Sequence, residues 1–161
     1  MRKEIYLILH NVRSLYNVGS IFRTSDAAGV KKIYLTGYTS APIDRFGKIR
    51  PEIHKTALGA ETTIEWQKYK DIGKLITKLR EVRLPKGSRT SIVTVEQTPN
   101  SLNYKKFKPR YPAVLIFGNE VRGLSKQILK KCDSVIEIPM HGKKESLNVS
   151  VSAGIILFSL K

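Results

Sequence analysis

The stretch of residues 138–160 reads IPMHGKKESLNVSVSAGIILFSL, a polar segment followed by a long apolar one. Its first half holds a proline and a glycine, which interrupt regular structure, and it is predicted to be a loop. The second half, 149–160, is apolar except for three serines and predicts a helix with Asn148 or Ser146 at its N-cap. Such a helix has apolar side chains on more than one face, so a single sheet does not cover it. We expect one face to pack on the core and the other to form a subunit interface.

Two loops are candidate parts of a ligand site. The loop 138–148 leads into a helix N-terminus, where free backbone N–H groups bind polar ligands. Residues 113–117, AVLIF, form a continuous apolar run that is typical of a central parallel strand, and they lead directly into 118–124. Ligands of open α/β sheets bind at the carboxyl ends of such strands.

The rest of the chain alternates between strand and helix patterns. Residues 17–29 predict a helix that Asn17 caps and Gly29 ends, between strands at 4–9 and 31–35. Two strands joined by one helix over so short a distance form a parallel βαβ unit. Further strands are predicted at 62–66, 90–95, 113–117 and 134–138, and further helices at 69–82 and 125–131. We expect one α/β domain, 1–161, with a mostly parallel sheet flanked by helices and no extension ahead of its first strand.

Net charge is the strongest signal in the composition. The 161 residues include 29 Lys and Arg against 13 Asp and Glu, a net charge of +16, which favours nucleic acid as the partner over a basic but unrelated enzyme. The single cysteine excludes an internal disulfide, and no apolar run has the length of a membrane span. A cytoplasmic protein is expected.

Two segments combine basic residues with loop or aromatic character. Residues 36–56 show no sustained period and are predicted to be a long loop, either an RNA clamp or a flexible surface loop. Residues 103–111, NYKKFKPRY, interleave basic and aromatic side chains, which suits phosphate contact with base stacking. A solvated loop leading into a strand explains the second pattern equally well.

Several common sites are absent from the sequence. It has no GxGxxG after its first strand, no GxxxxGK[ST] and no GxSxG, and its three histidines lack metal-ligand spacing. Three polar clusters remain: 17–24 (NVGSIFRT), 117–125 (FGNEVRGLS) and 138–150 (IPM through SLNVS). In order and spacing they resemble motifs one, two and three of the SpoU (TrmH-like) RNA ribose methyltransferases of the SPOUT superfamily.

That resemblance implies a fold and a cofactor. It implies a parallel sheet of five or six strands whose C-terminal segment threads a loop to form a deep trefoil knot, an exception to the usual unknotted topology. It also implies a homodimer that packs through the first and last helices. S-adenosylmethionine would bind in the knot, and the residues expected to contact it are Val95, Gly118, Ile138, Met140 and Leu147.

The resemblance further implies methyl transfer to a ribose 2′-hydroxyl, a poor nucleophile that needs a base. Arg23 would do this work, either by binding the substrate phosphate or, as a transiently neutral group, by accepting the proton. Asn17 would orient Arg23, and Glu120 would support the site or only bond the knot backbone. Ser146 and Asn148 would shape the third loop, in addition to capping the helix. RNA recognition is expected from Arg13, Arg45, Lys48, Arg50, His54, Lys55 and Arg122.

Three functions are compatible with these observations. The first is ribose 2′-O-methylation of tRNA or rRNA, and His54-Lys55 resembles the minimal tRNA-type enzymes, which favours tRNA. The second is a non-catalytic RNA-binding module that keeps the knotted fold, against which the intact motif residues argue. The third is a small basic ribosome-associated chaperone, which only the charge supports.

Overall fold

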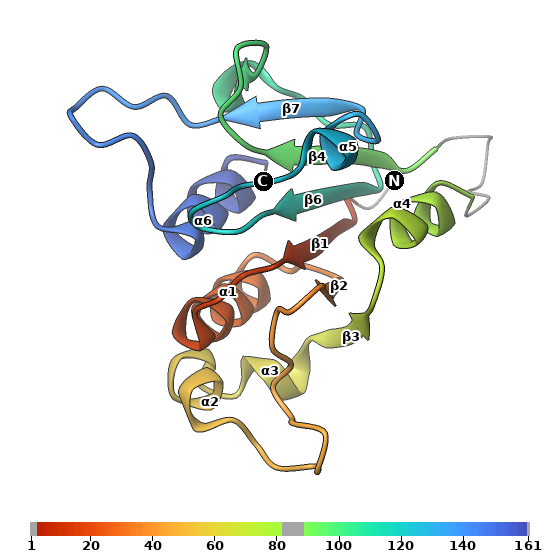
Figure 1. Ribbon diagram of the computed structural model, residues 1–161, viewed down its shortest axis with the longest axis vertical. Coiled ribbons are helices and arrows are strands. Elements are labelled where there is room, and N and C mark those ends of the chain that lie inside the picture. The colour runs from red at the N-terminus through yellow and green to blue at the C-terminus, as the bar shows by residue number, and fades with distance from the viewer. Residues whose placement is uncertain (1–2, 82–88, 161) are drawn as a thin grey trace.

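A seven-stranded parallel sheet forms the centre of the molecule in the computed structural model, which describes residues 3–81 and 89–160 (Figure 1). Its strand order is β3-β2-β1-β6-β4-β7-β5. The strands are β1 (Ile5–His10), β2 (Lys32–Thr36), β3 (Glu65–Tyr69), β4 (Ser91–Val95), β5 (Leu102–Asn103), β6 (Ala113–Phe117) and β7 (Ser134–Glu137). All strand pairs in the described part of the chain are parallel, which confirms the predicted sheet type.

Helices cover both faces of this sheet. They are α1 (Leu15–Ala27), α2 (Pro51–Ala57), α3 (Ala60–Thr63), α4 (Ile72–Glu81), α5 (Lys126–Leu129) and α6 (Val149–Ser159), with a short 3₁₀ turn η2 (Tyr104–Lys106). Side chains of α1, α2 and α6 pack in one core with Leu7 and Leu9 of β1, whereas α4 and α5 pack in a second core with Ile8. Alternate side chains of a strand point to opposite faces, so β1 contributes to both cores.

The strand β6 lies at the middle of the sheet, as its apolar sequence predicted. Ala113 to Phe117 are all buried, and β6 pairs with β1 on one side and β4 on the other. A strand covered on both faces needs apolar side chains at every position, which explains the continuous run. The loop that follows β6 is therefore held at a fixed place on the carboxyl edge of the sheet.

The first helix starts earlier than predicted, at Leu15. Its N-cap is Ser14, whose Oγ accepts a hydrogen bond from the Asn17 backbone N–H at 3.2 Å, so the prediction that Asn17 caps the helix is wrong. Ser14 satisfies the free N–H groups of the first turn. The amide side chain of Asn17 is consequently available for contacts outside the helix.

Other predicted boundaries also differ from the structure. The predicted loop 36–56 ends at Arg50, because Pro51 starts α2, where a proline is favoured at the first helical position. Helix α3 occupies part of the predicted strand 62–66, and β3 begins at Glu65. The resemblance implied five or six strands, and β5 adds a seventh because two of its residues pair with β7.

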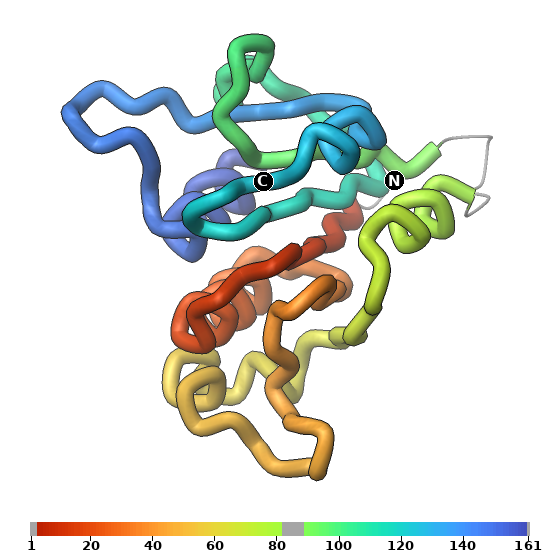
Figure 2. The backbone as a smooth tube through the Cα atoms, viewed as in Figure 1, coloured from red at the N-terminus to blue at the C-terminus, as the bar shows by residue number. Residues whose placement is uncertain are grey.

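The last helix begins where the sequence predicted. Asn148 is its N-cap, and the Asn148 Oδ1 accepts from the Ser150 N–H at 2.8 Å. One face of α6, with Ala153 and Ile156, is fully buried, while Phe158 on the other face is 54% exposed. Figure 2 shows the chain between β7 and α6 swinging away from the sheet before it returns to this helix. Within residues 3–81 and 89–160, no helix has the length and apolar character needed to span a bilayer.

Candidate active site

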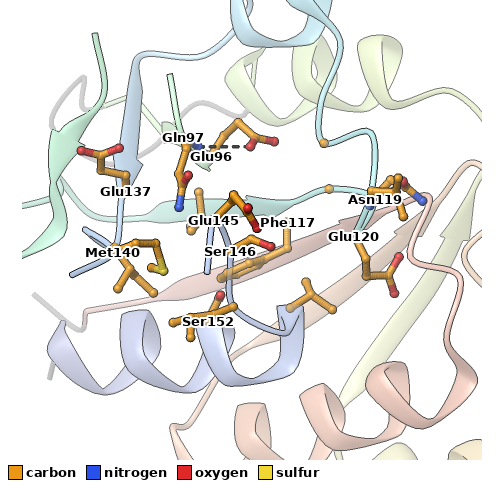
Figure 3. Close-up of a pocket in the computed structure, with 17 residues that line it drawn as sticks. Glu96, Gln97, Phe117, Asn119, Glu120, Glu137, Met140, Glu145, Ser146 and Ser152 are labelled. Carbon is orange, nitrogen blue, oxygen red and sulfur yellow. Dashed lines mark hydrogen bonds between the residues drawn. The ribbon is translucent and has the colours of Figure 1, made fainter. Parts of the chain in front are cut away.

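A cavity of about 300 Å³ lies at the carboxyl edge of the sheet, where the loops after β4, β6 and β7 meet the start of α6 (Figure 3). Its volume is at the lower end of the range for small-molecule sites. In Figure 3, Met140 and Glu137 lie on one side of the cavity and Glu120 on the other, with Ser146 between them. Parallel strands bring their carboxyl ends to one edge, which is why three distant segments form one wall.

All five residues that the resemblance assigned to the cofactor line this cavity. They are Val95, Gly118, Ile138, Met140 and Leu147. Two of the residues with expected catalytic roles, Glu120 and Ser146, line it as well. The structure thus brings the second and third motifs together around one cavity. The spacing of residues within each motif did not predict this contact between the motifs.

The wall that follows β6 is a tight turn built on Asn119. The Asn119 Oδ1 accepts from the backbone N–H groups of Val121 at 3.0 Å and Arg122 at 2.7 Å, and the Asn119 carbonyl accepts from the Gly123 N–H at 2.9 Å. Gly123 has a positive φ of 61°, and a Cβ added there would lie 2.3 Å from the Glu96 Oε2. Only glycine fits both the backbone conformation and the space.

Glu96 fastens this turn to the strand beside it. Its Oε2 accepts from the Leu124 N–H at 3.0 Å, and its Oε1 accepts from the Gln97 N–H at 3.1 Å. Gly118 lies against the same leucine, because a Cβ at Gly118 would be 2.7 Å from the Leu124 Cγ. The turn is therefore packed from behind, and its backbone forms a rigid side of the cavity.

Glu120 joins the second motif to the start of α1. Its carboxylate accepts from the backbone N–H groups of Arg13 at 3.2 Å and Ser14 at 3.3 Å, and from the Asn17 Nδ2 at 3.4 Å. Partial burial alone would raise the pKa of Glu120, but hydrogen bonds from its own backbone, Arg13, Ser14 and Asn17 outweigh that effect and lower the pKa below its ordinary value. Glu120 is thus held as a carboxylate.

Asn17 continues this connection to the third motif. Its Oδ1 accepts from the Asn148 Nδ2 at 3.1 Å, while the Asn148 Oδ1 bonds the first turn of α6. Glu120, Asn17 and Asn148 therefore form one hydrogen-bonded chain across three segments. Asn17 lies 103 residues from Glu120 and 131 residues from Asn148 in the sequence. Ser146 is exposed and lines the cavity between Met140 and Glu120 (Figure 3).

Arg23 is not part of this cavity in the single chain. It lies in a separate open hollow between α1, α2 and α6, together with Ser20, Thr24, Lys55 and Phe158. Asn17 and Arg23 share α1, as the spacing predicted, but only Asn17 bonds the residues of the cavity edge. The structure therefore brings together four of the five residues with expected catalytic roles.

The residues expected to bind RNA fall into two groups. Arg13 and Arg122 are exposed beside the Glu120 chain and the turn that Asn119 builds. Five others follow β2: Arg45, Lys48, Arg50, His54 and Lys55. Among these, His54 pairs with Glu61 through the Nδ1 and Oε1 at 2.5 Å, while the Nε of Arg50 is buried without a hydrogen-bond partner.

Sequence reasoning missed several residues of the cavity. Three further carboxylates, Glu96, Glu137 and Glu145, line it beside Glu120 in a protein with a net charge of +16. Gln97 and Ser152 are also part of the wall. Glu96 and Glu137 stand at the ends of predicted strands, so the carboxyl-end rule that marked the loop 118–124 would have marked them too.

Comparison with known proteins gives a consistent result. The profile of the SpoU rRNA Methylase family matches residues 4–158. The tRNA (guanosine(18)-2′-O)-methyltransferase of Aquifex aeolicus is 32% identical, over 98% of this chain and 68% of its own. The 23S rRNA (guanosine-2′-O-)-methyltransferase RlmB of Nitrosomonas europaea is 31% identical, over 96% of this chain and 54% of its own.

A solved structure shows the same fold. The AdoMet-bound rRNA methyltransferase of Sinorhizobium meliloti superposes with a TM-score of 0.85 and 28% identity, over 99% of this chain and 56% of its own. The chain thus spans about two thirds of the Aquifex relative and little more than half of the other two.

Proposed function

The chain belongs to the SpoU rRNA Methylase family, and on that premise we propose that it transfers a methyl group from S-adenosylmethionine to a ribose 2′-hydroxyl of tRNA or rRNA. One observation carries the proposal. The three motif segments meet at one cavity edge through the hydrogen-bonded chain of Glu120, Asn17 and Asn148. A non-catalytic RNA-binding module would have no need for that connection.

The cavity fits S-adenosylmethionine in charge and in polarity. When bound, this cofactor supplies an electrophilic methyl group on a sulfonium centre. Four carboxylates surround the cavity of an otherwise basic protein, which suits a ligand with cationic groups. Ile138, Met140 and Leu147 provide apolar surface for an adenine ring, and Val95 and Gly118 line the cavity at the ends of β4 and β6.

Homodimerisation would complete the site. Arg23 shares its hollow with Phe158, and neither residue lines the cavity of its own chain. Phe158 is 54% and Val151 49% exposed on the outer face of α6, where a soluble protein gains stability by burying them. A second copy packed on α1 and α6 would cover these side chains and could set Arg23 beside the partner's cavity.

At the reacting ribose, this chain must bind the nucleotide and accept or relay a proton. Arg23 would bind the phosphate next to the 2′-hydroxyl, where its positive charge favours the developing alkoxide, and the hydroxyl proton would pass to that phosphate as the oxygen takes the methyl group. Asn17, bonded to both Glu120 and Asn148, would fix the start of α1 and thereby the direction of Arg23. Ser146 would shape the loop between cofactor and substrate.

The threading of the C-terminal segment is part of the same proposal. The chain leaves β7, forms part of the cavity wall at Glu145 to Leu147 and enters α6 at Val149. A trefoil knot at this place would hold the two loops together without a disulfide. With tRNA or rRNA as the substrate, the proposed compartment is the cytoplasm.

RNA would bind along the basic surface of the domain. Arg13 and Arg122 stand beside the cavity, and Arg45, Lys48, Arg50, His54 and Lys55 extend the positive surface beyond β2. The named relatives act on tRNA and on rRNA respectively, and the resemblance of His54-Lys55 to the minimal tRNA enzymes favours tRNA here.

Labelled S-adenosylmethionine and total RNA test the proposal. We expect label in RNA, recovered as a 2′-O-methylated nucleoside. Arg23→Ala should lower the rate by about 10²- to 10³-fold, the usual share of a group that stabilises charge in the transition state, while calorimetry finds cofactor affinity unchanged. Lys126→Ala, an exposed change on α5, is the control for the loss of one positive charge. Absence of both cofactor binding and label would reject the function, and full turnover of Arg23→Ala would reject the role of Arg23.

A further inference from the structure

The segment between β2 and α2 is an ordered hairpin, which we define as residues 42–50. Ile43 and Ile49 form an antiparallel bridge, and the Arg50 N–H donates to the Pro42 carbonyl at 2.9 Å. At the tip, the Asp44 Oδ1 accepts from the backbone N–H groups of Phe46 at 2.8 Å and Lys48 at 2.9 Å. The tip of the hairpin, 43–49, is thus built from its own hydrogen bonds, whereas Pro42 at its base is buried.

This hairpin displays large apolar side chains to solvent. Phe46 is 71%, Ile49 62% and Ile43 45% exposed. The Arg45 guanidinium carbon lies 4.7 Å from the centroid of the Phe46 ring, a cation–π contact, yet most of the side chain remains open. An ordered turn that keeps an aromatic ring in water indicates a partner for that ring.

Charge around the tip selects the kind of partner. Arg45 and Lys48 flank Phe46, and the only acid of the hairpin, Asp44, uses one carboxylate oxygen to bond the turn backbone. A second copy of this chain that met the hairpin with its own hairpin would bring Arg45 and Lys48 against the same cations. An aromatic face between cations matches a nucleic-acid strand, because every base has a π-face and every nucleotide carries a phosphate.

We propose that the hairpin 42–50 is a binding site for an unpaired nucleobase of RNA, which stacks on Phe46 while Arg45 and Lys48 contact the adjoining phosphates. The proposal rests on the proposed function and sharpens it, because it requires a single-stranded loop or bulge in the substrate rather than a continuous duplex. Stacked bases inside a helix offer no free face to a side chain.

The segment that joins β2 to the hairpin, residues 37–41, is tied to the candidate active site. Tyr38, which follows β2, accepts at its hydroxyl from the Asn119 Nδ2 at 2.8 Å, and its backbone N–H donates to the Asn11 Oδ1 at 3.0 Å. Lys68 fixes the same joining segment by donating to the Gly37 carbonyl at 2.6 Å. A base held on Phe46 would therefore sit at a set distance from the turn that Asn119 builds.

The test compares variants of Phe46 in the full chain on a short unstructured RNA and on a duplex of the same length. Phe46→Ala and Phe46→Leu should each weaken binding to the unstructured RNA by about ten-fold, since leucine keeps apolar bulk but has no π-face. Phe46→Trp should bind as well as the natural chain or better. Duplex affinity should change less than two-fold in every variant. Leu102→Ala, an exposed apolar residue at the other edge of the sheet, is the matched control.

A second RNA isolates the stacking contact from the phosphates. Replacing a single base by an abasic ribose removes the base but keeps every phosphate. When the replaced base is the one that stacks on Phe46, the affinity of the natural chain should fall as much as it does in Phe46→Ala. The affinity of Phe46→Ala for the same abasic RNA should fall no further. Retained affinity in Phe46→Leu, equal losses on duplex and unstructured RNA, or a change of oligomeric state in Phe46→Ala would overturn the inference. Cofactor binding and methyl transfer are measured separately, so a failure of the proposed function would be recognised as such.

Discussion

The turn after β6 and the hairpin after β2 are built alike and used differently. Each opens on an Asx residue, Asn119 or Asp44, whose side-chain oxygen accepts two backbone N–H groups ahead of it. The carbonyl of each Asx residue also accepts from a glycine with positive φ, Gly123 or Gly47. Gly123 lies against Glu96, whereas a Cβ at Gly47 would have nothing within 4 Å.

This difference shows that local chemistry makes a turn and its surroundings decide what the turn can do. The turn at Asn119 is covered by Glu96 and Leu124, so its backbone can serve as a rigid cavity wall. The hairpin at Asp44 has no such cover, so its side chains remain free for a large partner. We expect mutations at matched positions of the two turns to have unequal effects.

The glycines should give the largest difference. Gly123→Ala places a Cβ against the Glu96 carboxylate and in a left-handed conformation, which together cost about 3 kcal/mol or more and should weaken cofactor binding by at least about 100-fold. Gly47→Ala has the conformational cost alone, about 1 kcal/mol, and should leave cofactor binding intact. Calorimetric titration and thermal unfolding measure both, and equal effects would remove the distinction between the turns.

The Asx residues should differ next. Asn119 is 8% exposed and also donates to Tyr38 and to the Asn11 carbonyl, so Asn119→Ala leaves buried groups unpaired and should cost about 2–3 kcal/mol of unfolding free energy. Asp44→Ala removes bonds that water can replace, and about 1 kcal/mol or less is expected. Denaturant unfolding compares them; a larger loss for Asp44→Ala would contradict our account of the two environments.

Charge reversal should separate RNA binding from cofactor binding. Arg45→Glu with Arg50→Glu should lower RNA affinity by about ten-fold or more and reduce the salt slope of binding by about one to two units, while cofactor affinity stays unchanged. Lys126→Glu with Lys130→Glu makes the same charge change at α5, beyond the turn at Asn119, and should have a weaker effect. If the Arg45/Arg50 and Lys126/Lys130 variants weaken RNA binding equally, the basic residues after β2 act only through the net charge of the protein.

Acid pH should have the smallest effect on the free energy of unfolding. We expect this effect to come from Glu120, beside the cavity, and not from the hairpin. The pKa of Glu120 is lower in the folded protein than its ordinary value, so its hydrogen bonds contribute stability above the unfolded pKa, near 4.5, and lose it as the pH falls through the folded pKa. Glu120→Gln should therefore make the unfolding free energy fall less steeply below about pH 4.5. Near pH 7 the dependence of the unfolding free energy on pH should be the same in the variant and the natural chain. An unchanged acid profile in the variant would mean that Glu120 gains nothing from its donors.

The fold was largely readable from the sequence because its signals are local or periodic. The continuous apolar run 113–117 predicted the central strand, and Asn148 before an apolar stretch predicted the start of α6. The three motif segments indicated the family that the profile then matched over residues 4–158. Boundaries failed where a competing local signal was stronger, as with Ser14 in place of Asn17 and Pro51 within the predicted loop.

Tertiary structure alone decided which of these residues meet. The sequence marked Asn17, Glu120 and Asn148, but their hydrogen bonds depend on how three segments cross at one edge of the sheet. It could not show that Arg23 lies outside the cavity of its own chain, or that Gly47 is open while Gly123 is packed. Spacing along a chain fixes which face of a helix or strand a side chain occupies, whereas packing between distant elements fixes what that face touches.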